Sequence, residues 1–539
     1  MLPQTGLSGT TTRLPIEIRR FPWVKRLASD YAFDYARVAD FFAGNPAEPA
    51  AWRDAIGRTQ RHARQRDAMA DVVQAQQRRR GAPPEAVAAA ARLRQVHTVA
   101  VVTGQQAGLF GGPLFTLLKA LTAIRLAERV AAEHRVPAVA VFWIDAEDHD
   151  WDEVKACGVL DADLNLAEVT LGRLPGAGER PVARVHLDDS IANAVAALGS
   201  VLPPTEFSPA LLETVGRAYR PGNGMADAFG QWLESILGPR GLVVFDAADE
   251  AAKPLAAPLF AREIEQAGET SRLAAAAGAA LVARGYHAQV TPQDDHLALF
   301  HLDGMRAAIR VHEARALLER VRTQPAEFSP NVLLRPIVQD ALFPTVCYVA
   351  GPNELAYLAQ LRDIYAAFGV PMPLMYQRGT ATILDSNAMR FLARHDLALE
   401  SLRAQDESAL NQLLEAQIPP AVHASHDEAI RAVTERMDAL AHVVAQLDST
   451  LEGAVRSTLG RMQDDLKKLH AKIIHAVKRK DDTVRRQFRH AQAQAFPGGH
   501  PQERAVGFVY FLNKYGGGFV DRLSDDLPLD QGTHWVVTI

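Results

Sequence analysis

A glycine-rich loop after a short β-branched segment is the first group of residues that could do chemistry. Residues 99–115 read VAVVTGQQAGLFGGPLF, which predicts a strand, a turn and the start of a helix. Loop amides and the positive end of a helix attract phosphates, and we expect Pro113 to leave that helix end free for one. A strand–helix connection without a ligand is the alternative. The candidate binding residues here are Thr103, Gly104, Gln105, Gln106, Gly108, Gly111, Thr116 and Lys119.

Acidic residues follow the next apolar segment, VAVFWI at 139–144. Because ligands of open α/β sheets bind at the carboxyl ends of strands, we expect these acids and the glycine loop to share one active site. They could hold Mg²⁺, bind an ammonium group or act as a general base; a helix start is the plainer interpretation. A zinc site is disfavoured because the segment has one histidine, and no metal-ligand set is assigned. The candidates are Asp148, His149 and Asp150 for catalysis and Trp143 for binding.

A third segment combines RPIVQD at 335–340 with TVCYVAGPNELAYL at 345–358. Arginine and glutamine are good anchors for a carboxylate or phosphate, and Glu354 and Tyr357 share a helix face. A capped helix after a core strand is the alternative. Cys347 lies in the apolar run and is more typical of a core residue than of a nucleophile. The candidate binding residues are Arg335, Gln339, Gly351, Asn353, Glu354 and Tyr357.

The composition is that of an ordinary globular protein. The chain has 539 residues, of which 48% are hydrophobic and 22% charged, with a net charge of −5. This balance gives no pull toward nucleic acid or anionic membranes. Two cysteines, an N-terminus without the apolar core of a signal peptide and no apolar run of the ~20 residues that span a membrane all favour a cytoplasmic location.

The elements that must position these residues are predicted to form an α/β core over 1–385. Strand-like segments alternate with helical ones from about 96 onward, which indicates a mainly parallel sheet with helices on both faces. We include the segments 296–303 and 305–311 among its strands. Residues before 95 are helical in pattern, and 155–235 are interpreted as an insertion. A tail, 501–539, is expected to pack back on this body.

A helical coiled-coil domain is predicted over 386–500. Apolar residues step by three and four, first at Ile430, Val433, Met437, Leu440, Val444 and Leu447 and then at Leu459, Met462, Leu466, Leu469, Ile473 and Val477. A break at 448–450, capped by Ser449, is favoured over a stutter in one helix. The two helices would then form an antiparallel hairpin. Basic residues over 467–489 indicate a solvated face, with a phosphate or an acidic partner as the alternative.

Five segments in the same order resemble those of the cysteine-adding enzymes of bacillithiol biosynthesis. They are TGQQAGLFGGPLFTLLKA, FWIDAEDHDWDEV, RPIVQDALFPTVCYVAGPNELAYLAQL, the coiled-coil segment, and FPGGHPQER followed by FLNKYG. The likeness runs from about residue 15 to the end. It implies a Rossmann-like core with inserted connecting segments, and a coiled-coil domain that pairs subunits into a homodimer. The seam could instead be satisfied within one hairpin.

The resemblance also implies an activity, the joining of L-cysteine to glucosaminyl-malate to complete bacillithiol. Amide formation from a free carboxylate is uphill, so we expect ATP and Mg²⁺ to activate the cysteine, most simply as an acyl-adenylate. Loop 104–113 and Lys119 would bind phosphate, the acids at 145–153 would bind Mg²⁺ or the cysteine amine, and Asp148 or His149 would deprotonate the glucosamine nitrogen. Another ATP-dependent ligase, a nucleotidyltransferase or a non-catalytic dimeric scaffold are the alternatives.

Overall fold

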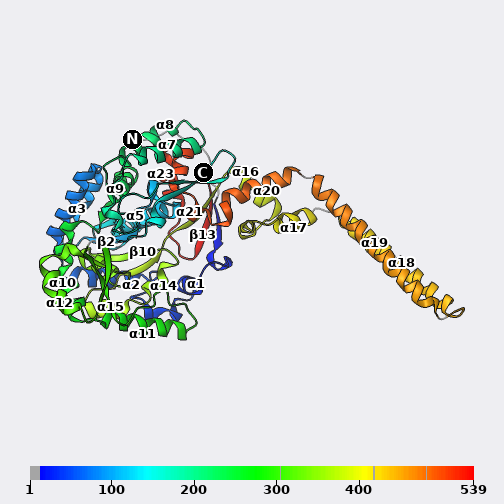
Figure 1. Cartoon of the computed structure of the whole chain (residues 1–539), viewed down its shortest axis with the longest axis horizontal. Helices are drawn as coiled ribbons and strands as arrows, with labels where there is room; N and C mark the ends of the chain where they lie inside the picture. The colour runs from blue at the N-terminus through cyan, green and yellow to red at the C-terminus, as the bar shows by residue number, and fades with distance from the viewer. Residues whose placement is uncertain (1–12, 304, 417–418, 449, 481) are drawn as a thin grey trace. The chain divides into compact units, whose positions relative to one another are not determined.

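The computed structural model of the chain describes residues 13–539, apart from 304, 417–418, 449 and 481 (Figure 1). It has two compact units. The first contains the residues up to Ile383 together with His500–Ile539, and the second contains Leu384–Gly499. In the described parts of the chain, no helix is both long enough and apolar enough to cross a membrane.

A five-stranded parallel sheet forms the centre of the first unit, with the strand order β11–β10–β2–β3–β6. Its strands are continuous apolar runs because both faces of a parallel sheet are covered. The predicted α/β core with a mainly parallel sheet is thus confirmed. The strands are β2 (Val99–Gln105), β3 (Ala138–Ile144), β6 (Val243–Asp246), β10 (Thr345–Ala350) and β11 (Leu374–Gln377).

The sheet separates two apolar cores. In β2, Val99 and Val101 belong to one core, whereas Ala100 and Val102 belong to the other, as the alternation of side chains along a strand requires. Helices α5 (Leu114–His134) and α9 (Met225–Leu237) pack into the first core. The second core contains α3 (Arg66–Arg80), α10 (Lys253–Glu265), α13 (Arg335–Leu342) and α15 (Arg362–Phe368).

The direction of chain progression across the sheet reverses between β2 and β10. From β2 the chain adds β3 and β6 on one side, and it later places β10 and β11 on the other. Ligands of open α/β sheets bind outside the carboxyl ends of the strands at such a switch point. The ends of β2 and β10, at Gln105 and Ala350, therefore mark where a site is expected.

Two long connections between strands of the parallel sheet carry additional elements. The segment predicted as an insertion at 155–235 contains an antiparallel strand pair and two helices ahead of α9: β4 (Ala156–Leu160), β5 (Leu166–Thr170), α7 (Ser190–Val201) and α8 (Ser208–Ala218). The connection from β6 to β10 contains a separate three-stranded sheet, β8–β7–β9. Its elements, besides α10 and α13, are α11 (Glu269–Ala283), β7 (His296–Asp303), β8 (Met305–Arg310), α12 (Ala314–Thr323) and β9 (Phe328–Pro330).

The expectation that segments 296–303 and 305–311 join the parallel sheet is wrong. These segments form β7 and β8, which pair with each other in antiparallel fashion. One residue separates the two strands. Parallel neighbours need a crossover of a dozen or more residues, so this connection permits only an antiparallel pair.

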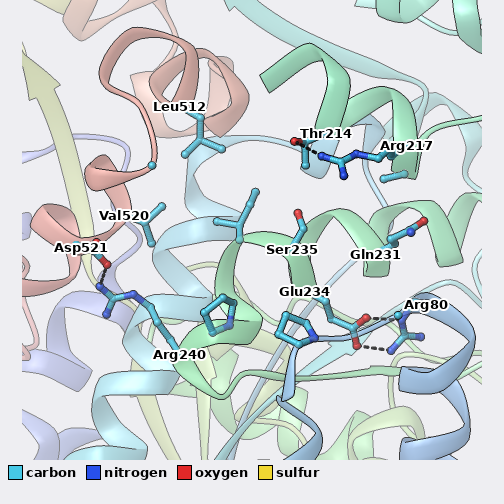
Figure 2. Close-up of a pocket in the computed structure, with 16 residues that line it drawn as sticks. Arg80, Thr214, Arg217, Gln231, Glu234, Ser235, Arg240, Leu512, Val520 and Asp521 are labelled. Carbon is cyan, nitrogen blue, oxygen red and sulfur yellow. Dashed lines mark hydrogen bonds and ion pairs between the residues drawn. The ribbon is translucent and has the colours of Figure 1, made fainter. Parts of the chain in front are cut away.

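A buried ion pair joins α3 to α9 beside a small cavity (Figure 2). Arg80 Nε and Nη2 donate to the two carboxylate oxygens of Glu234 at 2.9 and 2.7 Å. The cavity measures about 380 Å³ and also touches α8 and α23 (Gly518–Asp526). At its other side, Arg240 pairs with Asp521. None of the candidate residues predicted from the sequence lines this cavity.

The two ends of the chain meet in a second sheet of the first unit, β1–β13–β12. Gln502, in the C-terminal segment, exchanges two hydrogen bonds of 2.7 Å with the main chain of Ile383. This segment therefore forms part of the first unit. The elements are β1 (Arg13–Glu17), β12 (Thr380–Leu384), β13 (Thr533–Thr538), α21 (Gln502–Ala505) and α22 (Phe508–Tyr515), and the N-terminal helices are α1 (Arg26–Phe33), α2 (Pro49–Arg61) and α4 (Pro84–Arg92).

The second unit is helical, and its two long helices run antiparallel. Thr434 accepts a 3.0 Å hydrogen bond from Gln463, and His423 lies 3.2 Å from His470. The helix break falls between Ala445 and Leu451, at the predicted place, whereas Ser449 lies outside the described residues. The helices are α16 (Ser386–His395), α17 (Ser408–Ala416), α18 (Pro420–Ala445), α19 (Leu451–Lys480) and α20 (Asp482–Ala495).

Candidate active site

A cavity of about 750 Å³ lies at the switch point between β2 and β10, and we call it the strand-end cavity. Three segments that were predicted separately converge on it: the end of β2, the acids after β3, and α13 with the start of α14 (Glu354–Leu358). The predicted residues that line it are Gly104, Gln105, Gln106, Lys119, Asp148, Arg335, Gly351, Asn353, Glu354 and Tyr357.

A buried ion pair stands at the centre of this arrangement. Lys119 is 3% exposed, and its Nζ lies 2.6 Å from Glu354 Oε2. The same ammonium donates to Gly104 O at 2.8 Å and to Gln105 Oε1 at 3.2 Å. An ammonium has three donors, so all of them are engaged within the protein.

The carboxylate of Glu354 is equally well held. Its Oε2 accepts from the Gly351 amide at 2.5 Å, and its Oε1 accepts from the hydroxyls of Tyr348 and Tyr357 at 3.2 and 3.4 Å. Burial alone would raise the pKa of Glu354, but Lys119 and the Gly351 amide lower the pKa below its ordinary value. Glu354 is therefore an anion that fixes Lys119, because each of its oxygens is already bonded.

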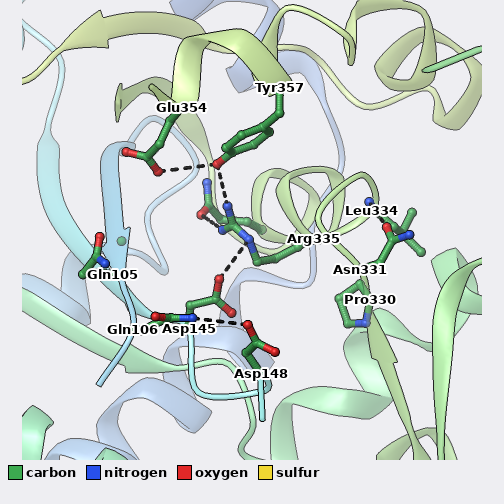
Figure 3. A network of polar contacts seen from close by, with 12 residues as sticks. Gln105, Gln106, Asp145, Asp148, Pro330, Asn331, Leu334, Arg335, Glu354 and Tyr357 are labelled. Atoms are coloured by element: carbon green, nitrogen blue, oxygen red, sulfur yellow. Dashed lines mark hydrogen bonds and ion pairs between the residues drawn. The ribbon is translucent and has the colours of Figure 1, made fainter. Parts of the chain in front are cut away.

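Arg335 links the two sides of the strand-end cavity (Figure 3). Its Nη2 donates to Tyr357 Oη at 3.1 Å, and its Nε lies 3.3 Å from Asp145 Oδ2. On its own helix, its Nη1 donates to Gln339 Oε1 at 3.5 Å. The end of β3 is thereby tied to α14 through a side chain from α13.

Asp148 lines the strand-end cavity and accepts hydrogen bonds from two elements. Gln106 Nε2 donates to its Oδ2 at 3.2 Å, and Arg306 Nη1 of β8 donates to its Oδ1 at 3.2 Å (Figure 3 shows the first). The Oδ1 also accepts from the backbone amide of His149 at 2.8 Å. A carboxylate in this position can orient a polar ligand or accept a proton from one.

The two other predicted catalytic residues lie away from the strand-end cavity. His149 and Asp150 line a neighbouring outer cavity, together with Asp148. The His149 side chain is 50% exposed, and its Nδ1 lies 3.2 Å from Asp148 Oδ1. Asp150 accepts from the Glu153 amide at 3.2 Å and so caps the short helix α6 (Trp151–Val154). His149 does not line the strand-end cavity itself and is connected to it by its contact with Asp148.

The acids after β3 do not form a metal-binding cluster. Glu147 turns into the core, where it forms a buried ion pair with Lys253. Among the residues that the structure describes, no group of three or more His, Cys, Asp or Glu is arranged to hold a metal ion. The segment thus supplies Asp145, Asp148 and Glu153 to the strand-end cavity as separate carboxylates.

The glycine loop does not present the free amides that we expected. The amides of Gly108 and Gly112 donate to carbonyls within the loop, and the Gly111 amide lies 3.1 Å from Tyr219 Oη. The expected open N-terminus of α5 is also wrong: the Leu114 amide donates to Val506 O at 2.8 Å, because the C-terminal segment packs across this helix end. With Lys119 also engaged, these particular groups are not free donors for the phosphate that the sequence predicts, and phosphate binding by the loop stays a prediction.

A second cavity, of about 610 Å³, lies on the other side of the loop, and we call it the loop cavity. It is lined by Gly108, Thr116 and the C-terminal residues His500 and Arg504, among others. It shares part of its wall with the strand-end cavity, so the two cavities are neighbours, and we refer to them as the two lobes of the cleft. The residues that line both are Gln105, Gln106, Phe115, Glu153 and Arg504.

Four predicted residues line none of these three cavities. Thr103 is buried and donates to Val349 O at 2.9 Å, so it joins β2 to β10. Trp143 packs in the core against Phe245 and Phe343, Gln339 binds Arg335 and Asp340, and Gly111 packs against Phe508.

Sequence analysis did not single out several residues of the cleft. Arg306 comes from β8 and Arg378 follows β11, whereas Arg504 comes from the C-terminal segment, whose residues 502–504 we considered either as a tail that docks or as one that lines a site. Phe115, Tyr348 and Asn331 also line the strand-end cavity. Only QER at 502–504 gave a signal, since arginine in a docking tail is a possible anion ligand.

Glu354→Gln is expected to lower the free energy of unfolding by about 3 kcal/mol, because it leaves the Lys119 ammonium buried without a counter-charge. Urea denaturation at neutral pH would measure the change. The double variant Lys119→Met/Glu354→Gln should recover most of the loss. A single variant as stable as the wild type would contradict this account of the ion pair.

Comparison with known proteins agrees with this architecture. The family model "Bacillithiol biosynthesis BshC, N-terminal Rossmann-like domain" matches residues 13–379, and "Bacillithiol biosynthesis BshC, C-terminal coiled-coil domain" matches residues 381–539. Relatives named "Putative cysteine ligase BshC" include those of Salinibacter ruber, 35% identical over 97% of this chain and 98% of the relative, and of Koribacter versatilis, 32% identical over 95% and 97%. The relative from Geobacillus thermodenitrificans is 29% identical over 97% of this chain and 100% of its own. The chain therefore belongs to the BshC family of bacillithiol biosynthesis.

Proposed function

We propose that the protein is a ligase that joins L-cysteine to glucosaminyl-malate to give bacillithiol. The observation that carries the proposal is the strand-end cavity, in which charged residues from three separate segments converge at the switch point of the sheet. Relatives that match the chain over nearly its whole length are named cysteine ligases. A low-molecular-weight thiol is kept reduced in the cytoplasm, which is where we place the protein.

The reaction forms one amide bond, between the cysteine carboxyl carbon and the glucosamine nitrogen, and releases one oxygen of the carboxylate. Because the direct condensation is uphill in water, we propose that ATP with Mg²⁺ activates the carboxylate. The amides of Gly108, Gly111 and Gly112 and the ammonium of Lys119 are engaged in internal bonds. We therefore assign no described residue to the nucleotide or the metal.

Asp148 is the residue that we propose as the general base for the glucosamine nitrogen. It lines the strand-end cavity, and a carboxylate or imidazole must lie within hydrogen-bond reach of the proton that it takes. His149 lies on the far side of Asp148, half-exposed in the outer cavity. In this proposal His149 acts through Asp148, and Arg306 keeps the carboxylate oriented.

The carboxylates of the malate group would need cations in the same cavity. Arg306 and Arg335 both line it, and each guanidinium group has N–H donors besides the one that meets a carboxylate. Arginine suits this task because its planar fork can bind a carboxylate through two hydrogen bonds. We propose that the malate group lies against these two side chains.

A product assay tests the proposed function. Purified protein with glucosaminyl-malate, L-cysteine, ATP and Mg²⁺ should yield the mass of bacillithiol, and each omission of a substrate should abolish it. A separate reaction without ATP shows whether ATP is needed to activate the cysteine carboxylate. No product from the complete mixture with folded protein would overturn the proposed function.

Asp148→Asn should lower kcat by about 100-fold or more, because a positioned base contributes on the order of 10²–10⁴ to a proton transfer. His149→Asn should reduce kcat by less than about tenfold, since its ring lies outside the strand-end cavity. Steady-state kinetics with both substrates saturating would measure the two effects. Full activity of Asp148→Asn would exclude Asp148 as the base.

We further propose a homodimer through the hairpin of α18 and α19. The inner face of the hairpin buries Ala441 and half-buries Ile430, Met437 and Val444. Large apolar side chains remain exposed outside it: Leu440, Val443, Leu447, Leu451, Met462, Leu469 and Ile473. Leu440, Leu447, Met462, Leu469 and Ile473 were predicted for the seam itself. An apolar surface of this extent indicates a partner, for which we propose a second copy of the hairpin.

Sedimentation at two protein concentrations should give a dimer for the wild type and a monomer for Leu447→Glu/Leu469→Glu, because each change places a charge on the exposed apolar face, where Leu447 is 82% exposed and Leu469 54%. Val282→Glu is the matched control, since Val282 is 60% exposed on α11 of the first unit. It should remain a dimer. A wild type that is monomeric at both concentrations would refute the dimer.

A further inference from the structure

Nearly every charged side chain that lines the strand-end cavity has an opposite charge beside it. Lys119 pairs with Glu354, Arg335 with Asp145, and Arg306 with Asp148. Arg378 pairs with Glu503, just outside the cavity, at 2.6 Å. These pairs hold the walls in place, and their charges are largely balanced before any ligand binds.

Two charged residues of this lining are exceptions among the described residues. Glu153 and Arg504 have no ion pair within 4 Å, although both line the cavity. Burial and the neighbouring acids Asp150, Asp148 and Asp145 raise the pKa of Glu153. Burial and Arg378 lower the pKa of Arg504. Both residues nevertheless remain exposed to solvent in the cleft, so a ligand of opposite charge can reach either of them.

Both residues also line the loop cavity, so they stand at the junction of the two lobes. The rest of the junction consists of the side chains of Gln105, Gln106 and Phe115. The Glu153 carboxylate and the Arg504 guanidinium have no ion-pair partners among the described residues and lie in the wall that the two cavities share. Their charges are opposite to those of the ammonium and the carboxylate of a free amino acid. An α-ammonium requires an anion, and an α-carboxylate suits the fork of an arginine.

We propose that the junction of the two lobes binds the zwitterionic head group of the amino acid substrate, with the α-ammonium at Glu153 and the α-carboxylate at Arg504. The inference rests on the proposed function in that it takes this amino acid to be L-cysteine. The thiol side chain then extends into the loop cavity, where Val154, Ala156 and Leu166 supply apolar wall. The acceptor lies in the strand-end cavity, and the carboxyl carbon lies between the two.

This arrangement explains why the acids after β3 are dispersed. Asp145 and Asp148 are held by arginines and shape the strand-end cavity, whereas Glu153, the third residue of α6, lines both cavities. Arg504 reaches the same junction from α21 of the C-terminal segment, where its guanidinium lies 5.7 Å from the Phe115 ring centroid. The C-terminal segment would therefore complete the site for the amino acid.

Equilibrium binding to the full-length protein, by calorimetry without acceptor or nucleotide, tests the proposal with three ligands. L-Cysteine carries both charges, cysteamine lacks the carboxylate, and 3-mercaptopropionate lacks the ammonium. Glu153→Gln should weaken L-cysteine and cysteamine at least tenfold and leave 3-mercaptopropionate unchanged. Arg504→Gln should weaken L-cysteine and 3-mercaptopropionate at least tenfold and leave cysteamine unchanged.

Glu133→Gln is the matched control, because Glu133 is an exposed carboxylate near the end of α5 and lines neither lobe of the cleft. It should bind all three ligands as the wild type does, and all variants should keep the wild-type melting temperature. Unchanged L-cysteine binding in both test variants would overturn the proposal. So would wild-type protein that binds no L-cysteine either alone or with glucosaminyl-malate present.

The same measurements separate this inference from the proposed function. If the two variants show the predicted effects on ligand binding while the product assay yields no bacillithiol, the result would support the amino acid site and refute glucosaminyl-malate as the acceptor. Bacillithiol formation with an unchanged KM for cysteine in both Glu153→Gln and Arg504→Gln would support the ligase and overturn the site.

Discussion

The ion pair of Lys119 and Glu354 constrains the geometry on which the cleft depends. A buried ammonium is stable only when its donors are all satisfied and its charge is matched. Lys119 meets this requirement with Gly104 O, Gln105 Oε1 and Glu354 Oε2. Two of these acceptors lie at the end of β2, and Glu354 begins α14 just after β10, so they come from the two strand ends that flank the switch point. The pair therefore fixes the opening of the cleft.

The remaining charges follow from that constraint. With the ends of β2 and β10 fixed, Arg335 can span from Tyr357 to Asp145 and so add the end of β3 to the same frame. Asp148 is then held between Gln106 and Arg306. Walls made of paired charges need little rearrangement when a ligand binds. In our proposal the charges without an ion-pair partner determine which ligand binds.

Much of the core could be predicted from the sequence because its signals are local. Continuous β-branched runs such as VAVVTG predict buried parallel strands. The carboxyl ends of parallel strands lie at the same edge of a sheet, so the meeting of their last residues can be predicted without long-range contacts. The rest depends on contacts between distant segments. Arg504 reaches the cleft because the C-terminal segment packs against α5, and no periodicity in residues 501–507 encodes that contact. Likewise, Leu440 and Leu447 fit the heptad pattern, yet the hairpin leaves them exposed.

The glycines of the loop have structural roles that do not depend on a ligand. A Cβ on Gly104 would lie 2.7 Å from Trp143 O, and one on Gly111 would lie 2.3 Å from Phe508. Gly112 has a φ of +74°, which other residues rarely adopt. Close packing and backbone conformation therefore account for these glycines without a phosphate. In our proposals, anion recognition in this cleft falls instead to Arg335 of α13, to Arg306 of the inserted sheet and to Arg504 of the C-terminal segment.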